Sequence, residues 1–252
     1  KILILMLNNR KLTFKQKRVF MKKFLLATAL MLFAFSTAQA EKLRIGATLK
    51  AGLFEVDEAS EIFSGAHSSG ASPGTVTKKA SAEGDEAVGE FAYGSIFVEI
   101  APNDKFSIGV DYVPMALESE TTENIQNIST DGKQVDSQAT NTVQVDFKDL
   151  TTVYALLHAT ENVYLKVGYM EVDVNTDESL GTGGSYGNTS LDGYTLGVGY
   201  TQDLDNGAFF RVEGNYMEID GTELTNANDA NKKVKADGIT GASVGISVGK
   251  TF

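Results

Sequence analysis

Histidine is the side chain best suited to proton transfer near neutral pH, and this sequence contains two, His67 and His158. His67 lies in the stretch SGAHSSG, close to Ser64, Ser68 and Ser69. A nucleophilic serine needs a base within hydrogen-bond reach and a third group that orients the base. Neighbours in one glycine-rich loop seldom hold that geometry, so we interpret His67 as a solvated loop residue. His158 comes just before a predicted turn, and we interpret it as a residue of the membrane interface.

Metal and cofactor chemistry would need clustered ligands that the sequence does not offer. With two His and no Cys, a typical structural zinc site is excluded. Three acidic groups could bind Ca²⁺ weakly, but none has EF-hand spacing, and we interpret them as solvated surface: Asp57, Glu58, Glu61; Glu118, Glu120, Glu123; Glu218, Asp220, Glu223. The glycine-rich stretch 181–184 lacks the lysine of a phosphate-binding loop. The sequence predicts no catalytic residue, no metal and no cofactor.

The first forty residues have the pattern of an export signal. Residues 21–40 begin with the basic MKK, continue with the apolar run FLLATALMLFAF, and end in an A-x-A motif at Ala38 and Ala40. The apolar run is shorter than the roughly 20 residues that a membrane helix needs. We therefore expect cleavage before Glu41 and a mature barrel domain over 41–252. Residues 1–20 are interpreted as an upstream or extended basic segment outside the native protein.

The mature chain is strongly acidic. Residues 1–40 contain eight Lys or Arg and no Asp or Glu, which leaves 14 basic and 33 acidic residues after position 40. Nucleic acid is excluded as a partner because phosphate contacts require Lys and Arg. Anionic lipid is disfavoured as an electrostatic partner for the same reason.

Apolar and polar residues alternate with a period of two through the mature chain, which is typical of β-strands that have one apolar face. The pattern predicts eight strands, at 43–55, 90–101, 105–115, 143–158, 163–175, 193–203, 208–218 and 240–252. Three connections are short and the other four, at 56–89, 116–142, 176–192 and 219–239, are long and polar. Long and short connections alternate strictly, as in outer-membrane barrels with short periplasmic turns and long extracellular loops.

The predicted fold class is therefore all-β, an eight-stranded antiparallel up-and-down transmembrane β-barrel. On the sixth strand, an apolar stripe starts and ends with tyrosine (Tyr194, Tyr200) and lies opposite a face of Thr and Gly. In a soluble barrel such as a lipocalin, the apolar faces would point inward and bind a ligand. In a membrane barrel the faces are inverted, so that the charges lie inside and pair with one another.

The export signal, the loop asymmetry and the tyrosine-bounded stripe favour the membrane barrel. We then expect an interior charge cluster of Arg44, Lys50, Glu99, Asp111, Lys166, Arg211 and Glu213. The second strand would face outward with Ile96, Val98 and Ile100. The fourth strand changes parity, which a β-bulge near Lys148–Leu150 would explain. Inward glycines would leave room for water: Gly46, Gly52, Gly109, Gly168, Gly197, Gly199, Gly245 and Gly249.

The chain ends in GASVGISVGKTF, an alternating strand whose last residue is aromatic. With the signal peptide and the eight strands, this ending resembles the small Gram-negative outer-membrane barrels of the OmpA, OmpX and opacity-porin type. In that family a final Phe is the signal read by the barrel-assembly machinery, and Phe252, Val248 and Ile246 match this pattern. Lys250 departs from it, since an apolar or aromatic residue is usual there.

The resemblance implies a location in the Gram-negative outer membrane, with membrane lipid and lipopolysaccharide as surroundings and the barrel-assembly machinery as a partner during biogenesis. It identifies no extracellular partner. We expect a non-catalytic barrel with a structural or surface-presenting role. A narrow porin-like channel for small solutes is the alternative, because the inward glycines could leave a water-filled path that the inward charges could equally block. A lipid A-modifying enzyme is a third hypothesis.

Overall fold

A computed structural model of the chain describes residues 42–56, 59–63, 75–79, 87–119, 121–128, 137–180 and 185–252. The predicted signal peptide, the upstream segment 1–20 and the expected cleavage site at Ala38, Ala40 and Glu41 lie outside these residues. No helix in the described ranges is long and apolar enough to cross a membrane.

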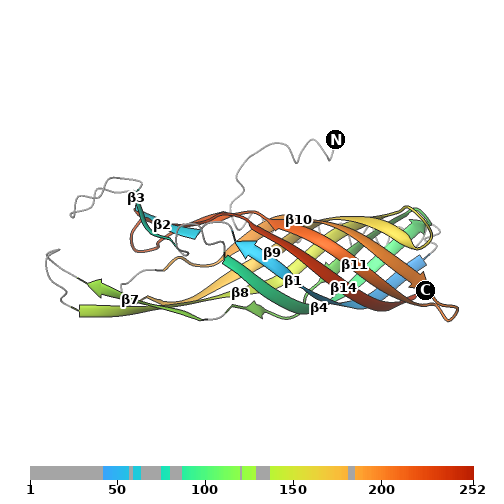
Figure 1. Cartoon of the computed structure of the whole chain (residues 1–252), viewed down its shortest axis with the longest axis horizontal. Helices are drawn as coiled ribbons and strands as arrows, with labels where there is room; N and C mark the ends of the chain where they lie inside the picture. Colours follow the sequence, from blue (N-terminus) through green and yellow to red (C-terminus); the bar gives the residue numbers. More distant parts are fainter. Residues whose placement is uncertain are drawn as a thin grey trace. The chain divides into compact units, whose positions relative to one another are not determined.

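Eight long strands form a closed antiparallel barrel in which neighbours along the chain are neighbours in space. The strands pair in the order β5-β4-β1-β14-β11-β10-β9-β8, and pairing of β8 with β5 closes the ring. Figure 1 shows these strands crossing the barrel obliquely. Their bounds are β1 (Lys42–Val56), β4 (Ala87–Asn103), β5 (Phe106–Tyr112), β8 (Ser137–His158), β9 (Val163–Leu180), β10 (Thr189–Asp203), β11 (Ala208–Ile219) and β14 (Ile239–Thr251).

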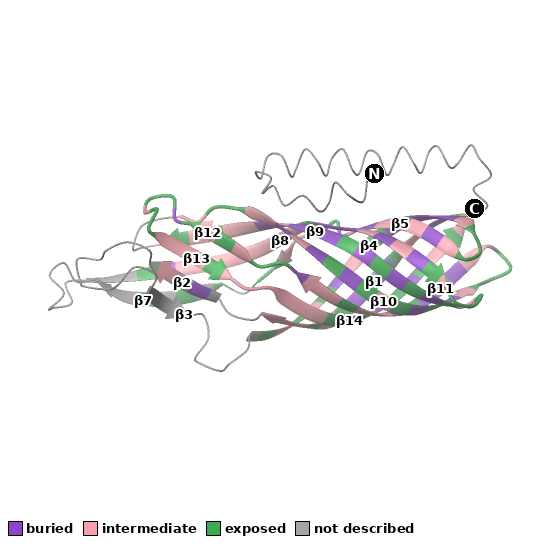
Figure 2. Ribbon diagram, turned by 90° about the horizontal axis from the view of Figure 1, so that it is seen from above, coloured by how far each residue is buried: buried purple, intermediate pink, exposed green. Residues whose placement is uncertain are grey.

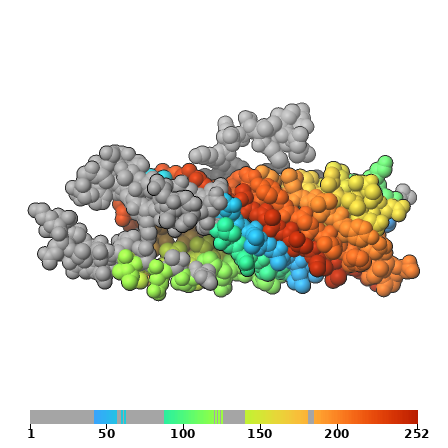
Figure 3. All heavy atoms as spheres, viewed as in Figure 1, coloured from blue at the N-terminus to red at the C-terminus, as the bar shows by residue number. Residues whose placement is uncertain are grey.

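The eight predicted strands and their antiparallel order are thus confirmed. Figure 3 shows the bands of β4, β1, β14 and β11 as adjacent oblique stripes, in agreement with this order. Three short connections, at 104–105, 159–162 and 204–207, lie at one end of the barrel, which we call the short-turn end. The turn after β10 uses Asn206-Gly207, and Gly207 has a φ of 79°, a conformation that favours glycine.

The segments expected to be loops contain further strands, and this part of the prediction was wrong. Strands β2 (Ala59–Phe63), β3 (Thr75–Lys79), β12 (Thr222–Thr225) and β13 (Lys232–Ala236) form a four-stranded sheet in the order β12-β13-β2-β3. The segment after β1 pairs with the segment before β14 because these two barrel strands are neighbours. In β2, β3, β12 and β13 the alternation of apolar and polar residues is short, and it was too weak to be recognised as strand from the sequence.

The wall beside β8 is built from several short pieces. β5 ends at Tyr112, so it pairs with only the last part of β8, from Thr151 to Leu157. Further along, β6 (Leu117–Glu118) and β7 (Thr122–Ile128) pair with β8 instead. The long strand β8 thus forms a hairpin with β7 beyond the part of the barrel that β5 covers.

A β-bulge changes the parity of β8, as the sequence predicted near Lys148–Leu150. Lys148 pairs with Asp173 and Thr151 with Glu171, so two residues of β8 lie opposite one residue of β9. Asp149 has a φ of 54°, in the left-handed region that Asp tolerates better than most residues. Its carboxylate accepts a hydrogen bond from the Tyr112 hydroxyl at 2.7 Å, which holds the bulge against β5.

The outer face of the barrel carries the apolar residues. Figure 2 shows buried and exposed residues alternating along the barrel strands. Large exposed apolar side chains form a belt on seven of the eight strands: Leu43, Ile45, Leu49, Ile96, Val98, Leu157, Leu165, Val167, Leu196, Val198, Phe210, Val212, Val244, Ile246 and Val248. Ile100, expected on this face, is buried instead, next to the irregular pairing between Ile100 and Asn103. The belt is the surface that a lipid bilayer covers.

The belt makes a testable prediction with a matched control. Leu196 in the belt and Leu204 in a short turn are both 48% exposed. In lipid vesicles, Leu196→Arg should lower the free energy of unfolding by roughly 2–4 kcal/mol, because a cation near the bilayer midplane is desolvated. Leu204→Arg, outside the belt, should change it little. Urea titrations followed by gel mobility of unheated samples measure both values; equal, small effects would identify a water-soluble barrel.

Candidate functional site

The barrel interior holds the charged residues that the sequence analysis predicted to lie there. All seven members of the predicted cluster are buried: Arg44, Lys50, Glu99, Asp111, Lys166, Arg211 and Glu213. They come from β1, β4, β5, β9 and β11, and on all of these strands except β5, which has no belt residue, they lie on the face opposite the apolar belt. Buried charges are stable only when they are paired and hydrogen-bonded, so their contacts decide what the interior can do.

The Glu99 carboxylate is the centre of this network. It is fully buried, and Arg211 binds it through two parallel hydrogen bonds of 2.7 and 2.8 Å. The hydroxyl of Tyr154 donates a third hydrogen bond to Glu99 at 3.1 Å. Paired donors of this geometry form one of the strongest interactions available to a carboxylate. The network therefore fixes β4, β8 and β11 against one another across the lumen.

Arg44 links this centre to the short-turn end. One of its nitrogens lies 3.6 Å from Glu99, and the other donates to both oxygens of Asp203 at 2.8 and 3.1 Å. Asp203 ends β10 and is 49% exposed at its side chain. The sequence analysis did not include Asp203 in the cluster, because it lies at the polar end of a strand where solvation was the simpler expectation.

Two further ion pairs lie along the same interior face. Lys166 donates to Glu213 at 2.8 Å, and the hydroxyl of Tyr164 donates to the other oxygen of Glu213, also at 2.8 Å. Lys50 lies 3.4 Å from Asp111, which also accepts a hydrogen bond of 2.9 Å from Ser95.

Aromatic rings fill the space between the ion pairs. The guanidinium of Arg211 lies 5.0–5.5 Å from the ring centres of Phe209, Phe97 and Tyr164. The ammonium of Lys166 lies 4.7 Å from the ring centre of Tyr154. Cations are attracted to aromatic faces at these distances. Phe97, Phe209 and Tyr164 share strand parity with the interior charges of their strands, so the sequence pattern already places them on the inward face.

Five of the eight predicted inward glycines are covered by aromatic rings. These five each lie directly opposite an aromatic residue of the next strand, whose ring packs over the glycine: Gly46 with Phe97, Gly52 with Phe91, Gly109 with Tyr154, Gly199 with Tyr164, and Gly249 with Phe209. A Cβ atom at any of these positions would collide with the ring. These five glycines therefore let large rings pack close to the inner wall of the barrel.

Beyond the ion pairs, away from the short-turn end, the interior is apolar. The buried cluster here consists of Tyr93, Val113, Leu150, Met170, Val172, Val174, Leu191 and Ile219. Val145 and Phe147, which precede the β8 bulge, pack against it. The residues before the bulge and those after it have opposite parity. Because of the bulge, both sets face the same interior. Sequence analysis missed this cluster because it assigned every interior face a polar character.

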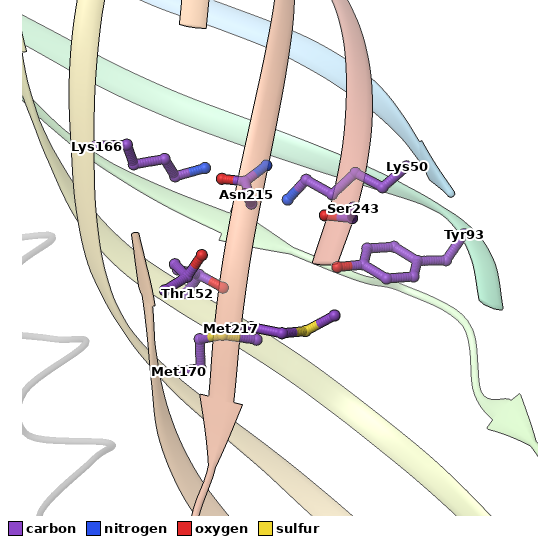
Figure 4. A pocket seen from close by; sticks show the side chains of 9 residues that line it. Lys50, Tyr93, Thr152, Lys166, Met170, Asn215, Met217 and Ser243 are labelled. Atoms are coloured by element: carbon purple, nitrogen blue, oxygen red, sulfur yellow. The ribbon is translucent and has the colours of Figure 1, made fainter. Parts of the chain in front are cut away.

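A small cavity lies where the ion pairs meet the apolar cluster. Its volume is about 20 Å³, and Figure 4 shows the side chains around it. It is lined by Lys50, Tyr93, Thr152, Lys166, Met170, Thr195, Asn215, Met217 and Ser243. A space of this size holds little more than one water molecule.

Few groups elsewhere in the barrel have the geometry of a catalytic site. His158 lies 3.3 Å from the hydroxyl of Ser107 and packs against the ring of Tyr164. Ser107 is fully buried, so a substrate has no path to its oxygen. His67 lies outside the described residues. Within the part of the chain that the structure describes, no group of three or more His, Cys, Asp or Glu is placed to hold a metal ion.

The residues expected to form the assembly signal lie on the outside. Ile246 and Val248 belong to the belt, and Phe252 is 66% exposed. The backbone of Phe252 pairs with that of Leu43, which joins the chain end to β1. The ammonium of Lys250 lies 5.6 Å from the Phe252 ring centre. Recognition of Phe252 by the assembly machinery stays a prediction.

The interior network predicts a large effect of removing one partner. Arg211→Ala leaves Glu99 buried without its main partner, and should lower the free energy of unfolding by about 3–5 kcal/mol. The double variant Arg211→Leu/Glu99→Leu should be less destabilised than the single one, because no charge stays behind. Lys42→Ala removes an exposed ion pair with Asp104 and is the matched control, with a loss below about 1 kcal/mol. Wild-type stability of Arg211→Ala would mean that the interior assignment is wrong.

The glycine–aromatic pairs make a separate prediction. Gly199→Val places a branched side chain against the ring of Tyr164 and should destabilise the barrel by about 1–3 kcal/mol. Gly214→Val is the control on β11, because no atom lies within 4 Å of a Cβ there. Urea titration of both variants in detergent compares them. The Gly199 effect should shrink in a Tyr164→Ala background, and an unchanged effect would show that the ring is not its cause.

No family model matches the chain, and no curated protein matches it. Similar solved structures include the outer membrane protein OprG from Pseudomonas aeruginosa, at 13% identity over 84% of this chain and 95% of that one, with a TM-score of 0.42. Ail, the attachment invasion locus protein of Yersinia pestis, solved with the heparin analogue sucrose octasulfate, matches at 10% identity, 83% and 99% coverage and a TM-score of 0.36. The outer membrane protease OmpT from Escherichia coli matches at 12% identity, 84% and 97% coverage and a TM-score of 0.37. The chain's own exposed apolar belt and buried ion pairs identify it as a transmembrane β-barrel.

Proposed function

We propose that this protein is a non-conducting, non-catalytic barrel that anchors and presents its long connections at the cell surface. The observation that carries the proposal is the set of buried charges and rings on the inward face of the wall. Ion pairs from β1, β4, β5, β9 and β11 lie inside the barrel, together with five rings that pack over inward glycines. An eight-stranded barrel has an interior only just wide enough for its own side chains, so this packing leaves little room for a solute.

The long connections support a presenting role. β2, β3, β12 and β13 form their own four-stranded sheet, and β7 pairs with the start of β8. By connectivity, all of these elements follow barrel strands at the end opposite the short turns. In an outer-membrane barrel that end faces the outside. Paired strands hold a fixed surface, as a binding platform requires.

Catalysis has less support than presentation. The contact between Ser107 and His158 resembles a nucleophile and its base, and its serine is buried. A lipid A-modifying activity would need reactive groups open to the outer leaflet, and this pair lies next to the short-turn end.

Conductance in planar lipid bilayers tests the proposal against the channel alternative. The refolded protein, with folding verified by the mobility of unheated samples on gels, should produce no discrete current steps, because the lumen is occupied by paired charges and rings. An established porin inserted under the same conditions serves as the positive control. Reproducible steps from the folded wild-type protein would replace the proposal with the narrow-channel function.

A further inference from the structure

The small interior cavity is lined by an unusual set of polar groups. Two ammonium groups, from Lys50 and Lys166, line it together with the amide of Asn215. The other polar groups around it are the hydroxyls of Tyr93, Thr152, Thr195 and Ser243. None of its lining residues is a carboxylate. The cavity is thus surrounded mostly by groups that donate hydrogen bonds.

The carboxylates that neutralise the two lysines lie outside the lining. Lys166 pairs with Glu213 at 2.8 Å and Lys50 with Asp111 at 3.4 Å, a longer contact. An ammonium group has three N–H donors, and one carboxylate oxygen satisfies one of them. Figure 4 shows the Nζ ends of both lysines directed toward Asn215 from opposite sides.

Asn215 supplies the observation that points to a ligand. Its Nδ2 and Oδ1 atoms are both buried, and neither has a hydrogen-bond partner in the described part of the chain. It lies on β11 across from Gly197, where the missing side chain makes room for the amide. A buried amide N–H without an acceptor is costly, and an acceptor in the adjacent cavity would satisfy the Nδ2 group.

Size and surroundings restrict what can bind. With a volume of about 20 Å³, the cavity suits one water molecule or one monatomic ion. Met170 and Met217 close the apolar side with polarizable sulfur atoms. Because Asp111 and Glu213 already offset the charges of the two ammonium groups, a bound anion is held by the remaining N–H groups of Lys50 and Lys166 and by the Asn215 amide N–H.

We propose that this cavity binds one small monovalent anion of halide size, held between Lys50, Lys166 and the Asn215 amide. The anion connects β1, β9 and β11 across the lumen. Because it binds the folded barrel and not the unfolded chain, its stabilisation of the fold increases with its concentration. The site is independent of the proposed surface-presenting role.

Bromide is the direct probe, because it scatters anomalously and resembles chloride in size and charge. Crystals of the wild-type protein grown in sodium bromide should show one anomalous peak in the cavity. In detergent solution, sodium chloride should raise the Tm by at least about 2 °C over sodium gluconate at the same ionic strength, since gluconate is too large to enter. A cavity that holds only water gives no peak and equal Tm values, and that result would overturn the proposal.

Variants separate this site from general salt effects. Asn215→Leu fills the cavity with an apolar side chain and should remove the difference between chloride and gluconate. Asn228→Leu makes the same change at an exposed position and should keep it. A chloride effect that persists in Asn215→Leu would place the ion elsewhere and contradict the assignment. If Asn215→Leu does not fold, the bromide peak of the wild-type protein decides alone. Conductance measurements are unaffected by either result, so this inference and the proposed function can fail separately.

Discussion

The buried carboxylate of Glu99 is the constraint on which the barrel interior depends. A fully buried negative charge is tolerable only with strong, well-directed partners. Arg211 supplies two hydrogen bonds, Tyr154 a third, and Arg44 lies close by while it reaches Asp203. These partners come from β11, β8 and β1, so Glu99 sets the relative height of three strands besides its own. The strand register of the barrel wall and the pairing of charges in the lumen therefore depend on each other.

The glycines of the wall follow from the same requirement. The rings beside Arg211 are large, and a narrow barrel can hold them only if they lie flat against the neighbouring strand. Gly249 opposite Phe209 and Gly199 opposite Tyr164 provide that space. A slip of one residue would place a ring opposite a larger side chain and move the charges into lipid. These glycines make room for packed rings, whereas the sequence alone suggested that inward glycines leave open space in the lumen.

A feature of the fold could be predicted from the sequence when it repeats along a single strand. The eight strands, the apolar belt and the interior charges follow from a period of two, and the parity change of β8 indicated the bulge at Asp149. The individual side-chain ion pairs between strands were not predictable, because Arg211 and Glu99 are 112 residues apart in the sequence and Arg44 and Asp203 are 159. The sheet formed by β2, β3, β12 and β13 was missed for the same reason, since its short strands become recognisable only beside each other. The apolar cluster around Leu150 and Met170 was missed because charges elsewhere made every inward face look polar.

These long separations also bear on how the barrel assembles. Among the described residues, Glu99 has two ion-pair partners. Arg44 lies 3.6 Å away on the neighbouring strand β1, whereas Arg211 lies on a strand that is not a neighbour of β4. Arg211 reaches Glu99 only when β11 and β4 stand on the same closed ring, with β14 and β1 between them. An open sheet in a bilayer would expose both charges without their partner. Pairing of β14 with β1 removes the last free edges and brings these charges together in one step. Ring closure and charge neutralisation are then coupled, and a partly closed barrel is disfavoured by both.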